Sequence, residues 1–562
     1  MAKKAKNILF IMFDQLRFDY LSCYGHPHLD TPNIDRLASQ GVRFTNCYVQ
    51  SPICGSSRMS FYTGRYASSH GALWNGYPLK VGEMTIGDHL RTLGMDSYLI
   101  GKTHMRADVD GMTRLGIPPD SLIGARVAEC GFDAYVRDDG LWPEGPDGFY
   151  DVLHSQYNEY LIEKGYDSEN PWLDYANAGV DDKGEIASGW MMMHAGKPAN
   201  IREEDSETPY MTSQCIKFID EMKSTGDKPW LCHLSYIKPH WPYIAPEPYH
   251  SMYSAKDVIP VNRHENEKID THPVYEQFMN NVVGQAFRRD DVLEAVVPTY
   301  MGLIKQCDDQ LGRLFAHLEA SGRMDDTMIV ITSDHGDNMG DHWLGEKDLF
   351  HEPSAKIPMI IYDPSSEADS TRGMVCDELT ESIDLAATFY EAAGGEVKDN
   401  LDHILEGHSL LPLLHGHTTG PLREYAFSEY DYSVTPAAIK LDLNPRDAQL
   451  YMVTDKRWKF IFAEGFRPML FDRQEDPQEL VDLGTSESPE HIEVRSRLYE
   501  ALSQWWRRVS QRTTKSENDL RNMRGKTRRR GIVLGLYDGS EAPAEITAKF
   551  RGKVSQRYTS ED

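Results

Sequence analysis

Short apolar runs recur along this chain with amphipathic segments between them, and this alternation constrains the fold more than any other feature. The runs have the length of strands and are rich in β-branched and aromatic residues; they occupy residues 7–13, 97–101, 230–237, 328–333 and 358–362. Segments with helical spacing occupy residues 31–40, 85–93, 211–222 and 300–321. Buried strands that alternate with helices are typical of parallel sheets. We therefore predict an α/β fold in which helices sandwich a large, mostly parallel sheet.

The pattern changes near residue 400, so a second region is expected there. Residues 450–483 have the pattern of antiparallel strands joined by turns, and residues 490–509 that of a helix. We expect a catalytic α/β domain over residues 1–400, a smaller α+β region with an antiparallel sheet over 401–510, and a tail over 511–562. The tail carries the basic run RNMRGKTRRR at 521–530. It is either a solvated segment or an arm that joins the subunits of a homo-oligomer, a dimer or a tetramer.

The composition limits the partners of the protein. Its 562 residues include 59 Lys and Arg against 87 Asp and Glu, which gives a net charge of −28. Such an acidic surface disfavours nucleic acid and anionic membranes, so an anionic substrate needs a local cluster of cations. No apolar run reaches the ~18 residues of a membrane helix. The 8 cysteines are sparse and lack CxxC spacing, which favours free thiols in a reducing compartment. We expect a cytoplasmic protein.

Polar residues with metal-binding chemistry follow two of the apolar runs. The first run ends in Asp14-Gln15, and a later one ends before Asp334-His335. Ligands of such sheets bind beyond the carboxyl ends of the strands. Hard oxygen donors with one imidazole suit a divalent cation such as Ca²⁺ or Mn²⁺. Taken singly, an Asp after a strand is usually a helix cap or a turn residue, but the two together favour a metal site.

The segment SPICGSSR predicts a nucleophile at the start of a helix. Ser51 is the expected cap and Pro52 lies in the expected first turn, as does Cys54. Free N–H groups at that end of a helix favour an anion, and Arg58 follows four residues later on the same face. A cysteine phosphatase loop needs C-x5-R, whereas this spacing is C-x3-R. The alternative is a buried Cys beside a surface Arg.

Basic residues follow three further strand or loop ends. They are Lys102 and His104 in GKTH, Lys238 and His240 in KPHWP, and Lys347 in GEKDLFHE. Singly, each would be read as a surface residue. Together, lysines and histidines that converge on a metal would bind a tetrahedral anion and transfer protons. Such a cluster would supply the local positive charge that an anionic substrate needs on a protein with a net charge of −28.

Several motifs stand in a fixed order from residue 7 to residue 483: NILFIMFDQ, TPNIDRLASQGVRFTNCYVQSPICGSSR with Thr63-Gly64-Arg65 behind it, GKTH, KPHWP, ITSDHGDNMGDH and LFDRQEDPQELVDL. In this order they resemble the sulfatase family, within the alkaline-phosphatase-like superfamily. The resemblance implies that a maturation system converts Cys54 to formylglycine. One hydroxyl of the hydrated aldehyde would then attack the sulfur of a sulfate ester. The implied ligands of one divalent metal are Asp14, Gln15, Asp334, His335 and residue 54.

The resemblance also implies roles for the basic residues. Arg58 and Lys102 would hold the nucleophile, and Lys102 and Lys347 would neutralise the sulfate oxygens. His240 would protonate the leaving alcohol or phenol, and His104 would take the proton of the second hydroxyl so that sulfate is released. The implied activity is that of an arylsulfatase. Asn75 matches a substrate-side amide of some family members; otherwise it is a turn residue.

Three positions depart from the common family pattern. Gln15 stands where a second Asp is usual, His335 where Asn is usual, and Ser56 where Pro or Ala is commoner. An imidazole ligand shifts the expected metal toward Mn²⁺. Asp-Gln and Asp-His also occur in the phosphonate monoester and phosphodiester hydrolases of the superfamily, so this activity is the alternative, either alone or as a second activity of one site. A third possibility is a metal-dependent anion-binding protein whose Cys54 stays a thiol.

Overall fold

The computed structural model describes residues 5–140, 155–181, 183–398, 400–418, 420–511, 513–524, 537–541 and 543–548. They fall into two compact units. The larger unit holds the sheets, and the smaller holds residues of 396–404 together with the C-terminal helices α17 (Glu517–Met523) and α19 (Ala544–Thr547). In the described ranges no helix is long and apolar enough to cross a membrane. Residues 525–530 of the basic run lie outside these ranges, so the subunit arm and the division at residues 400 and 510 stay predictions.

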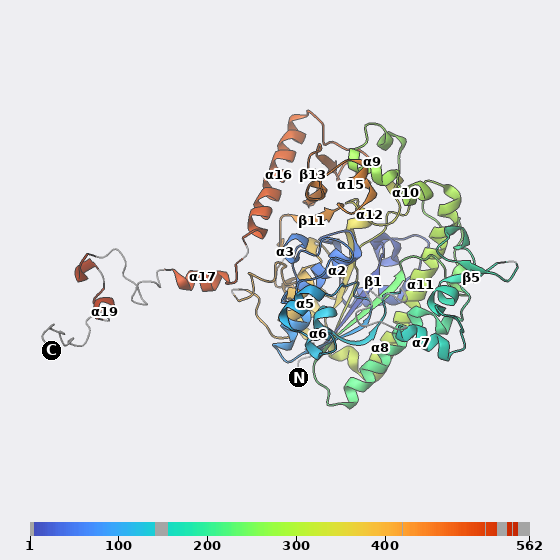
Figure 1. Ribbon diagram of the computed structural model, residues 1–562, viewed down its shortest axis with the longest axis horizontal. Helices are drawn as coiled ribbons and strands as arrows, with labels where there is room; N and C mark the ends of the chain where they lie inside the picture. The colour runs from blue at the N-terminus through green and yellow to red at the C-terminus, as the bar shows by residue number, and fades with distance from the viewer. Residues whose placement is uncertain are drawn as a thin grey trace. The chain divides into compact units, whose positions relative to one another are not determined.

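An 8-stranded sheet forms the centre of the larger unit (Figure 1). Its strand order is β10-β2-β9-β8-β1-β7-β3-β4, and neighbours run parallel except at β9, which is antiparallel to β2 and β8. This confirms the predicted α/β fold. The sequence did not predict β2, β4 or β10. The bounds are β1 Asn7–Asp14, β2 Val42–Tyr48, β3 Asp96–Gly101, β4 Asp133–Arg137, β7 Trp230–Pro239, β8 Thr327–Ser333, β9 Lys356–Tyr362 and β10 Met374–Glu381.

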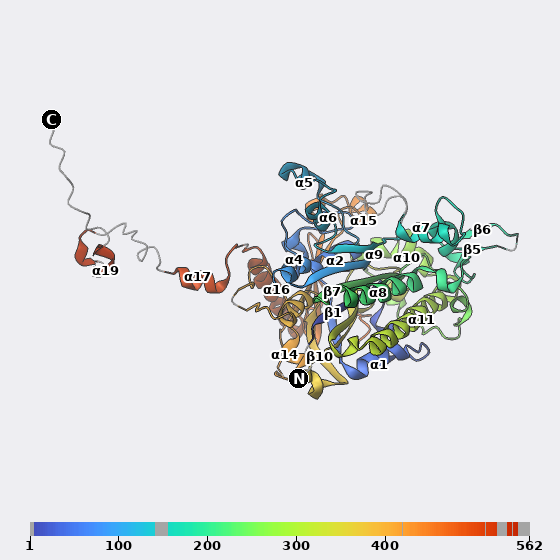
Figure 2. The same ribbon diagram turned by 90° about the horizontal axis from the view of Figure 1, so that it is seen from below.

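Helices cover both faces of this sheet, which is why β1 is buried along its whole length (Figure 2). Leu9 and Ile11 belong to the core cluster that also contains residues of α1, α8 and α11. Phe10 points to the other face, where its ring centroid lies 6.1 Å from that of Phe61 in α2 and 5.3 Å from that of Phe389 in α13. The helix bounds are α1 Pro32–Gln40, α2 Cys54–Thr63, α4 Ile86–Arg91, α8 Glu207–Ser224, α11 Asp290–Ser321 and α13 Asp384–Ala392.

The central strands β8, β1, β7 and β3 are adjacent and mutually parallel, so they end at the same edge of the sheet. Close contact between strand ends requires glycine at Gly101, whose φ is 107°. A Cβ at this residue would lie only 2.0 Å from the carbonyl oxygen of Ser235 on β7. The residues that follow these strands therefore converge. This edge is where the sequence predicts the metal and the cations.

A second sheet of 4 antiparallel strands follows in the order β11-β12-β13-β14. On one face, Val453 and Phe460 pack against Leu498 and Trp505 of α16 (Pro489–Val509). The other face belongs to a core cluster that includes Phe350. This confirms the predicted antiparallel sheet and its helix, although β11 was not predicted. The strand bounds are β11 Ala426–Asp431, β12 Gln449–Thr454, β13 Trp458–Ala463 and β14 Met469–Asp472.

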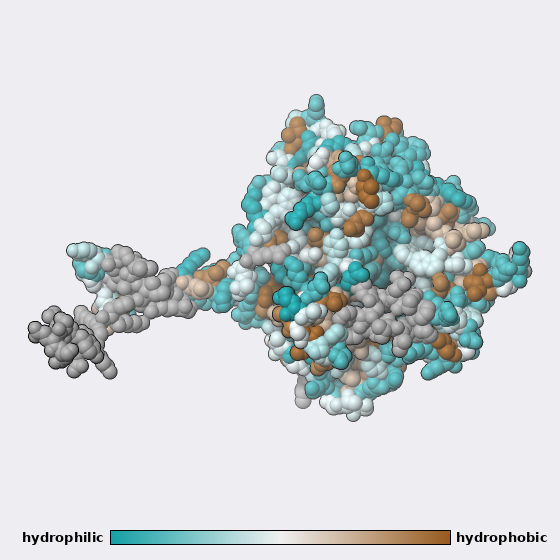
Figure 3. Space-filling model, in the orientation of Figure 1, coloured by the Kyte–Doolittle hydropathy of each residue, from teal (hydrophilic) through white to brown (hydrophobic). Residues whose placement is uncertain are grey.

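Shorter elements complete the larger unit, and a small antiparallel pair, β5 and β6, stands apart from the two sheets. The face of the molecule in Figure 3 is mostly hydrophilic with separate apolar patches, in agreement with the net charge of −28. The remaining bounds are β5 Ala178–Val180, β6 Ile186–Ser188, α3 Ala67–His70, α5 Val109–Leu115, α6 Leu122–Ala128, α7 Gln156–Glu163, α9 Pro273–Met279, α10 Val282–Phe287, α12 Glu352–Ala355, α14 Leu411–Leu414 and α15 Pro436–Lys440.

Candidate active site

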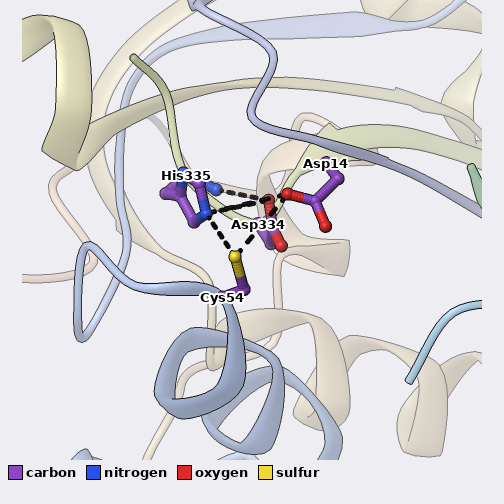
Figure 4. Close-up of side chains that lie close together, drawn as sticks. All are labelled: Asp14, Cys54, Asp334 and His335. Atoms are coloured by element: carbon purple, nitrogen blue, oxygen red, sulfur yellow. Dashed lines mark hydrogen bonds and ion pairs between the residues drawn. The ribbon is translucent and has the colours of Figure 1, made fainter. Parts of the chain in front are cut away.

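Four buried side chains meet at the carboxyl edge of the large sheet (Figure 4). Asp14 ends β1, Asp334 and His335 follow β8, and Cys54 begins α2. Each offers one donor atom, and these atoms lie within 4.8 Å of one another. The residues that the sequence selected on two strands and one helix are therefore neighbours in space, although Asp14 and His335 are 321 positions apart in the chain.

Helix α2 presents Cys54 from its first residue. The prediction that Ser51 caps this helix and Pro52 lies in its first turn is wrong, because Ile53 has extended backbone (φ −145°, ψ 137°) and the helix begins only at Cys54. The Cys54 thiol is still at the helix start, where backbone N–H groups are free to face an anion. Its side chain is completely buried.

Asn75 and Ser57 fix this helix start in place. The amide oxygen of Asn75 accepts a hydrogen bond of 2.7 Å from the backbone N–H of Gly55, and a Cβ at Gly55 would lie 2.9 Å from that oxygen. The hydroxyl of Ser57 donates to the backbone oxygen of Asp334. The Ser56 hydroxyl is buried and has no hydrogen-bond partner among the described residues. Asn75 thus caps the helix that carries Cys54, and it also faces the cavity described below.

Arg58 is fully buried and bridges the carboxylates of Asp14 and Asp334. Its Nε donates to Asp334 at 2.7 Å and one terminal nitrogen donates to Asp14 at 3.2 Å. The other terminal nitrogen donates to the Lys102 carbonyl at 3.0 Å and to the Ser235 hydroxyl at 2.8 Å. A planar guanidinium can fill all of these positions at once, whereas an ammonium cannot.

Cations keep Asp14 ionised in spite of its burial. The Lys102 ammonium lies 2.6 Å from Oδ2 of Asp14. Burial alone would raise the pKa of Asp14, but the charged side chains of Lys102 and Arg58 outweigh burial and hold this pKa well below its usual value. Its other oxygen, Oδ1, faces the Cys54 sulfur at 3.7 Å. One side of the carboxylate is therefore neutralised and the other side is open toward the cluster.

His335 is oriented with one ring nitrogen toward the cluster. Its Nδ1 lies 2.8 Å from the Gly336 carbonyl oxygen, to which it can donate, and its Nε2 lies 3.0 Å from the Cys54 sulfur. Burial opposes a charge on this ring, but Asp334 and Cys54 raise the pKa of His335 to about 9. A backbone partner on one ring nitrogen is the usual way to direct the other toward a metal.

Gln15 is held by partners that the sequence did not reveal. Its backbone is left-handed (φ 66°), and its amide nitrogen donates to Asp337 and to Tyr243. These bonds turn the amide oxygen toward the site, where it accepts a hydrogen bond from Lys347 at 3.3 Å. The second Asp in SDHGD is the only signal in the sequence for Asp337. Nothing in the sequence indicates the position of Tyr243.

The donor set fits a single divalent cation. Two carboxylates, one imidazole and one amide oxygen converge in a buried site, and Oδ1 of Asp14 and Nε2 of His335 point into it. Carboxylate and amide oxygens suit Ca²⁺ or Mn²⁺, and the imidazole favours Mn²⁺ or another transition ion.

Lys347 and His240 also lie beside Cys54 and the candidate metal ligands. The Lys347 ammonium lies 3.1 Å from the Cys54 sulfur and 3.1 Å from Nε2 of His240. Burial would lower the pKa of Lys347, but Cys54 and Glu346 raise it above its usual value. Burial lowers the pKa of His240 well below its usual value. The free protein therefore holds a charged lysine against a neutral imidazole.

His104 joins this group, whereas Lys238 does not. The backbone N–H of His104 donates to Asp139 at 2.8 Å, and its buried Nδ1 has no hydrogen-bond partner among the described residues. Burial lowers the pKa of His104 well below its usual value, and Lys102 adds to this shift. Lys238 instead donates to Asn177 at 2.7 Å, so it supports the KPHWP loop.

A cavity of about 390 Å³ opens onto these residues. Its polar wall includes Asn75, Lys102, His104, His240 and Lys347, so the structure brings every catalytic and substrate-side prediction except Cys54 and Arg58 to its lining, where the carboxylates of Asp139, Glu346 and Asp348 also lie. Its aromatic wall was not predicted, because the tryptophans come from separate loops without a shared motif. They are Trp74, Trp172, Trp190 and Trp241.

Comparison with known proteins places the chain in a family. The profile of the sulfatase family matches residues 6–395, and that of the C-terminal region of N-sulphoglucosamine sulphohydrolase matches residues 340–508. The chain is 30% identical to the multifunctional alkaline phosphatase superfamily protein PehA of Trinickia caryophylli, over 85% of this chain and 91% of the relative. It is 28% identical to an arylsulfatase of Clostridium perfringens, over 86% and 90% of the two chains.

Solved structures agree with this placement. The phosphonate monoester hydrolase of Silicibacter pomeroyi superimposes with a TM-score of 0.76 at 27% identity, over 91% of this chain and 96% of the other. That of Agrobacterium radiobacter gives a TM-score of 0.75 at 27% identity, over 90% and 96%. The chain therefore belongs to the sulfatase family, a family of sulfuric ester hydrolases within the alkaline-phosphatase-like superfamily.

Proposed function

We propose that the protein hydrolyses sulfate monoesters, aryl sulfates above all, after Cys54 has been oxidised to formylglycine. The observation that supports this most is the position of Cys54 at the start of α2, within 3.1 Å of both His335 and Lys347. A divalent ion and an aldehyde at residue 54 would supply a hydrated, acidified hydroxyl as the nucleophile. The ion would be held by Asp14, Gln15, Asp334 and His335.

The cations of the site have two tasks in this proposal. Lys102 and Lys347 neutralise the sulfate oxygens, on which charge increases in the transition state. Arg58 keeps the two acidic side chains in position, because it donates to both of them. A sulfate monoester carries one negative charge, so it enters a site in which three buried cations surround two carboxylates.

Proton transfer falls to the two histidines. His240 accepts a hydrogen bond from the charged Lys347, so this pair can deliver a proton to the leaving oxygen once the anionic substrate favours the protonated imidazole. His104 is neutral, with a free buried nitrogen, and can therefore accept a proton when sulfate is released. The tryptophans of the cavity suit the flat face of an aryl leaving group.

Substitution of Cys54 tests the proposal. We expect C54A to lose turnover of 4-nitrophenyl sulfate by at least about 10³-fold, because the nucleophile is absent. The matched control is C232A, which removes another fully buried free cysteine from β7, away from the site. Mass spectrometry of the wild-type peptide that contains residue 54 should find an aldehyde in place of the thiol. A thiol in fully active protein, or full activity of C54A, would refute the assignment.

A second activity, hydrolysis of phosphonate monoesters or phosphodiesters, is favoured by Gln15 and His335 and by the similarity to phosphonate monoester hydrolases. These substrates are also tetrahedral monoanions, so the same cations serve them. We expect kcat/KM to be higher for an aryl sulfate than for the matching aryl phosphonate monoester. A phosphonate preference of several orders of magnitude would reverse the order of the two activities.

Other predictions accompany this function. The aldehyde requires a maturation system as a partner. The cytoplasmic location and the homo-oligomer stay predictions, and analytical ultracentrifugation of the full chain is the measurement that decides the oligomeric state.

A further inference from the structure

A second cavity of about 270 Å³ adjoins the catalytic cavity. The two cavities share three wall residues, Trp190, Trp241 and Glu346. Beyond them the second cavity is apolar, and its lining includes Met192, Val283 and Phe287. An alcohol longer than a single ring would therefore leave the catalytic cavity by passing these three shared residues.

The rings of the two shared tryptophans lie close to each other at this junction, and the Lys347 ammonium lies 5.6 Å from the ring centroid of Trp241. The ring centroids of Trp190 and Trp241 lie 4.9 Å apart with an interplanar angle of 58°, and Trp172 follows at 6.3 Å from Trp190. The indole N–H of Trp241 is buried and has no hydrogen-bond partner among the described residues. Several indole faces at an angle to one another form the kind of box that binds organic cations.

Glu346 supplies a carboxylate at the same place. In the described part of the chain its side chain has neither a hydrogen bond nor an ion pair. Burial raises the pKa of Glu346 to about 7, against the opposing effect of Lys347. Asp139, another carboxylate of the catalytic cavity, differs in being paired with Arg137 at 2.6 Å. Of these two carboxylates, Glu346 is the one without an ion pair in the described part of the chain.

We propose that Glu346, Trp190 and Trp241 form a subsite for an organic cation, so that the preferred substrates are sulfate esters of alcohols that carry a quaternary or protonated amine. This inference rests on the proposed sulfatase activity and extends it to the leaving group. The sulfate would lie among Lys102, Lys347 and the metal ligands, and the cation would lie at the junction of the two cavities. Such a substrate would place its sulfate among the cations of the site and its own cation beside the carboxylate of Glu346.

Matched substrates test the subsite. We would compare phenyl sulfates that carry, in the para position, a trimethylammonium group on a chain of one, two or three methylenes with isosteres that end in a tert-butyl group. At pH 8, where Glu346 is ionised, we expect kcat/KM to favour the cation at least about fivefold at the best chain length. In E346Q this ratio should fall toward one, whereas in the matched control D139N it should stay. Because only ratios are compared, a general loss of activity cancels.

The same comparison can be made without turnover. The corresponding phenols, which carry no sulfate, can be titrated against the tryptophan fluorescence of wild-type protein and E346Q. Tighter binding of the cationic phenol to wild type alone would support the subsite. Equal binding, or a wild-type preference for the tert-butyl compounds at every chain length, would overturn it. If no sulfate is hydrolysed, the proposed function fails, and the phenols still decide the subsite.

Discussion

At the scale of single residues, Arg58 holds the site together through charge and shape. It is fully buried between Asp14 and Asp334, so its removal leaves two carboxylates without their shared cation. We expect R58A to lower the free energy of unfolding by about 3–5 kcal/mol. R58K should cost less, because it keeps the charge but cannot reach both carboxylates. Denaturant unfolding measures both.

An exposed arginine provides the control for this prediction. Arg36 pairs with Glu319 at 3.0 Å on the surface, where both side chains are more than 40% exposed. We expect R36A to change the free energy of unfolding by less than about 1 kcal/mol. If R58A is no more costly than R36A, the structural role of Arg58 is wrong.

Asn75 combines a structural and a substrate-side position, and two substitutions separate them. N75A removes the acceptor of the Gly55 N–H and should cost about 1 kcal/mol, as the loss of other helix caps does. N75D keeps an acceptor but adds a negative charge to the cavity, so we expect little loss of stability and a higher KM for an anionic substrate. Thermal unfolding and steady-state kinetics test this. An unchanged KM in N75D would exclude contact with the substrate.

At the scale of elements, the sequence predicts those strands and helices that are determined by the local pattern of apolar and polar residues. Apolar runs identified β1, β3, β7, β8 and β9, and the polar residues behind them gave the candidate metal ligands, which the structure brings together. The antiparallel direction of β9 could not be predicted, because a short apolar run carries no direction. The prediction that the helix starts at Ser51-Pro52 is wrong, because tertiary packing keeps the backbone of Ile53 extended and α2 begins only at Cys54. The cavity tryptophans escaped prediction for the same reason, since only tertiary structure brings Trp172 and Trp190 together.

Strand β7 carries a buried histidine that makes stability depend on pH. His233 is fully buried, and burial lowers its pKa to about 3. The unfolded chain, with a His pKa near 6.5, therefore binds more protons than the folded chain between about pH 3 and 6.5. The contribution of the neutral His233 side chain to the free energy of unfolding is complete above pH 6.5. It decreases by up to about 1.4 kcal/mol per pH unit as the pH falls below this value. H233Q should be less stable at pH 7, but the difference should shrink toward pH 4 in thermal unfolding; a constant difference would contradict this.

At the scale of the whole molecule, a buried ion cluster ties the C-terminal sheet to the α/β part. Lys459 of β13 is fully buried and lies 2.8 Å from Glu352 of α12 and 2.6 Å from Glu479. We expect K459M to lower the free energy of unfolding by about 3–5 kcal/mol, because the buried carboxylate of Glu479 loses its cation, whereas Glu352 keeps Lys356 and Arg473. The control is K456M, whose partially exposed ammonium pairs with Glu378 at 3.1 Å and should matter little. Equal stability of the two variants would show that the cluster does not join the parts.

The complete burial of Cys54 limits the stage of biosynthesis at which this side chain can be modified. In the folded protein no atom of this side chain is accessible to a modifying enzyme. The oxidation of Cys54 that we propose would therefore have to happen while the nascent polypeptide is still open around residue 54. A purified protein that was made without its modifying partner would then be permanently inert, whereas production in a cell that contains the partner would yield competent molecules.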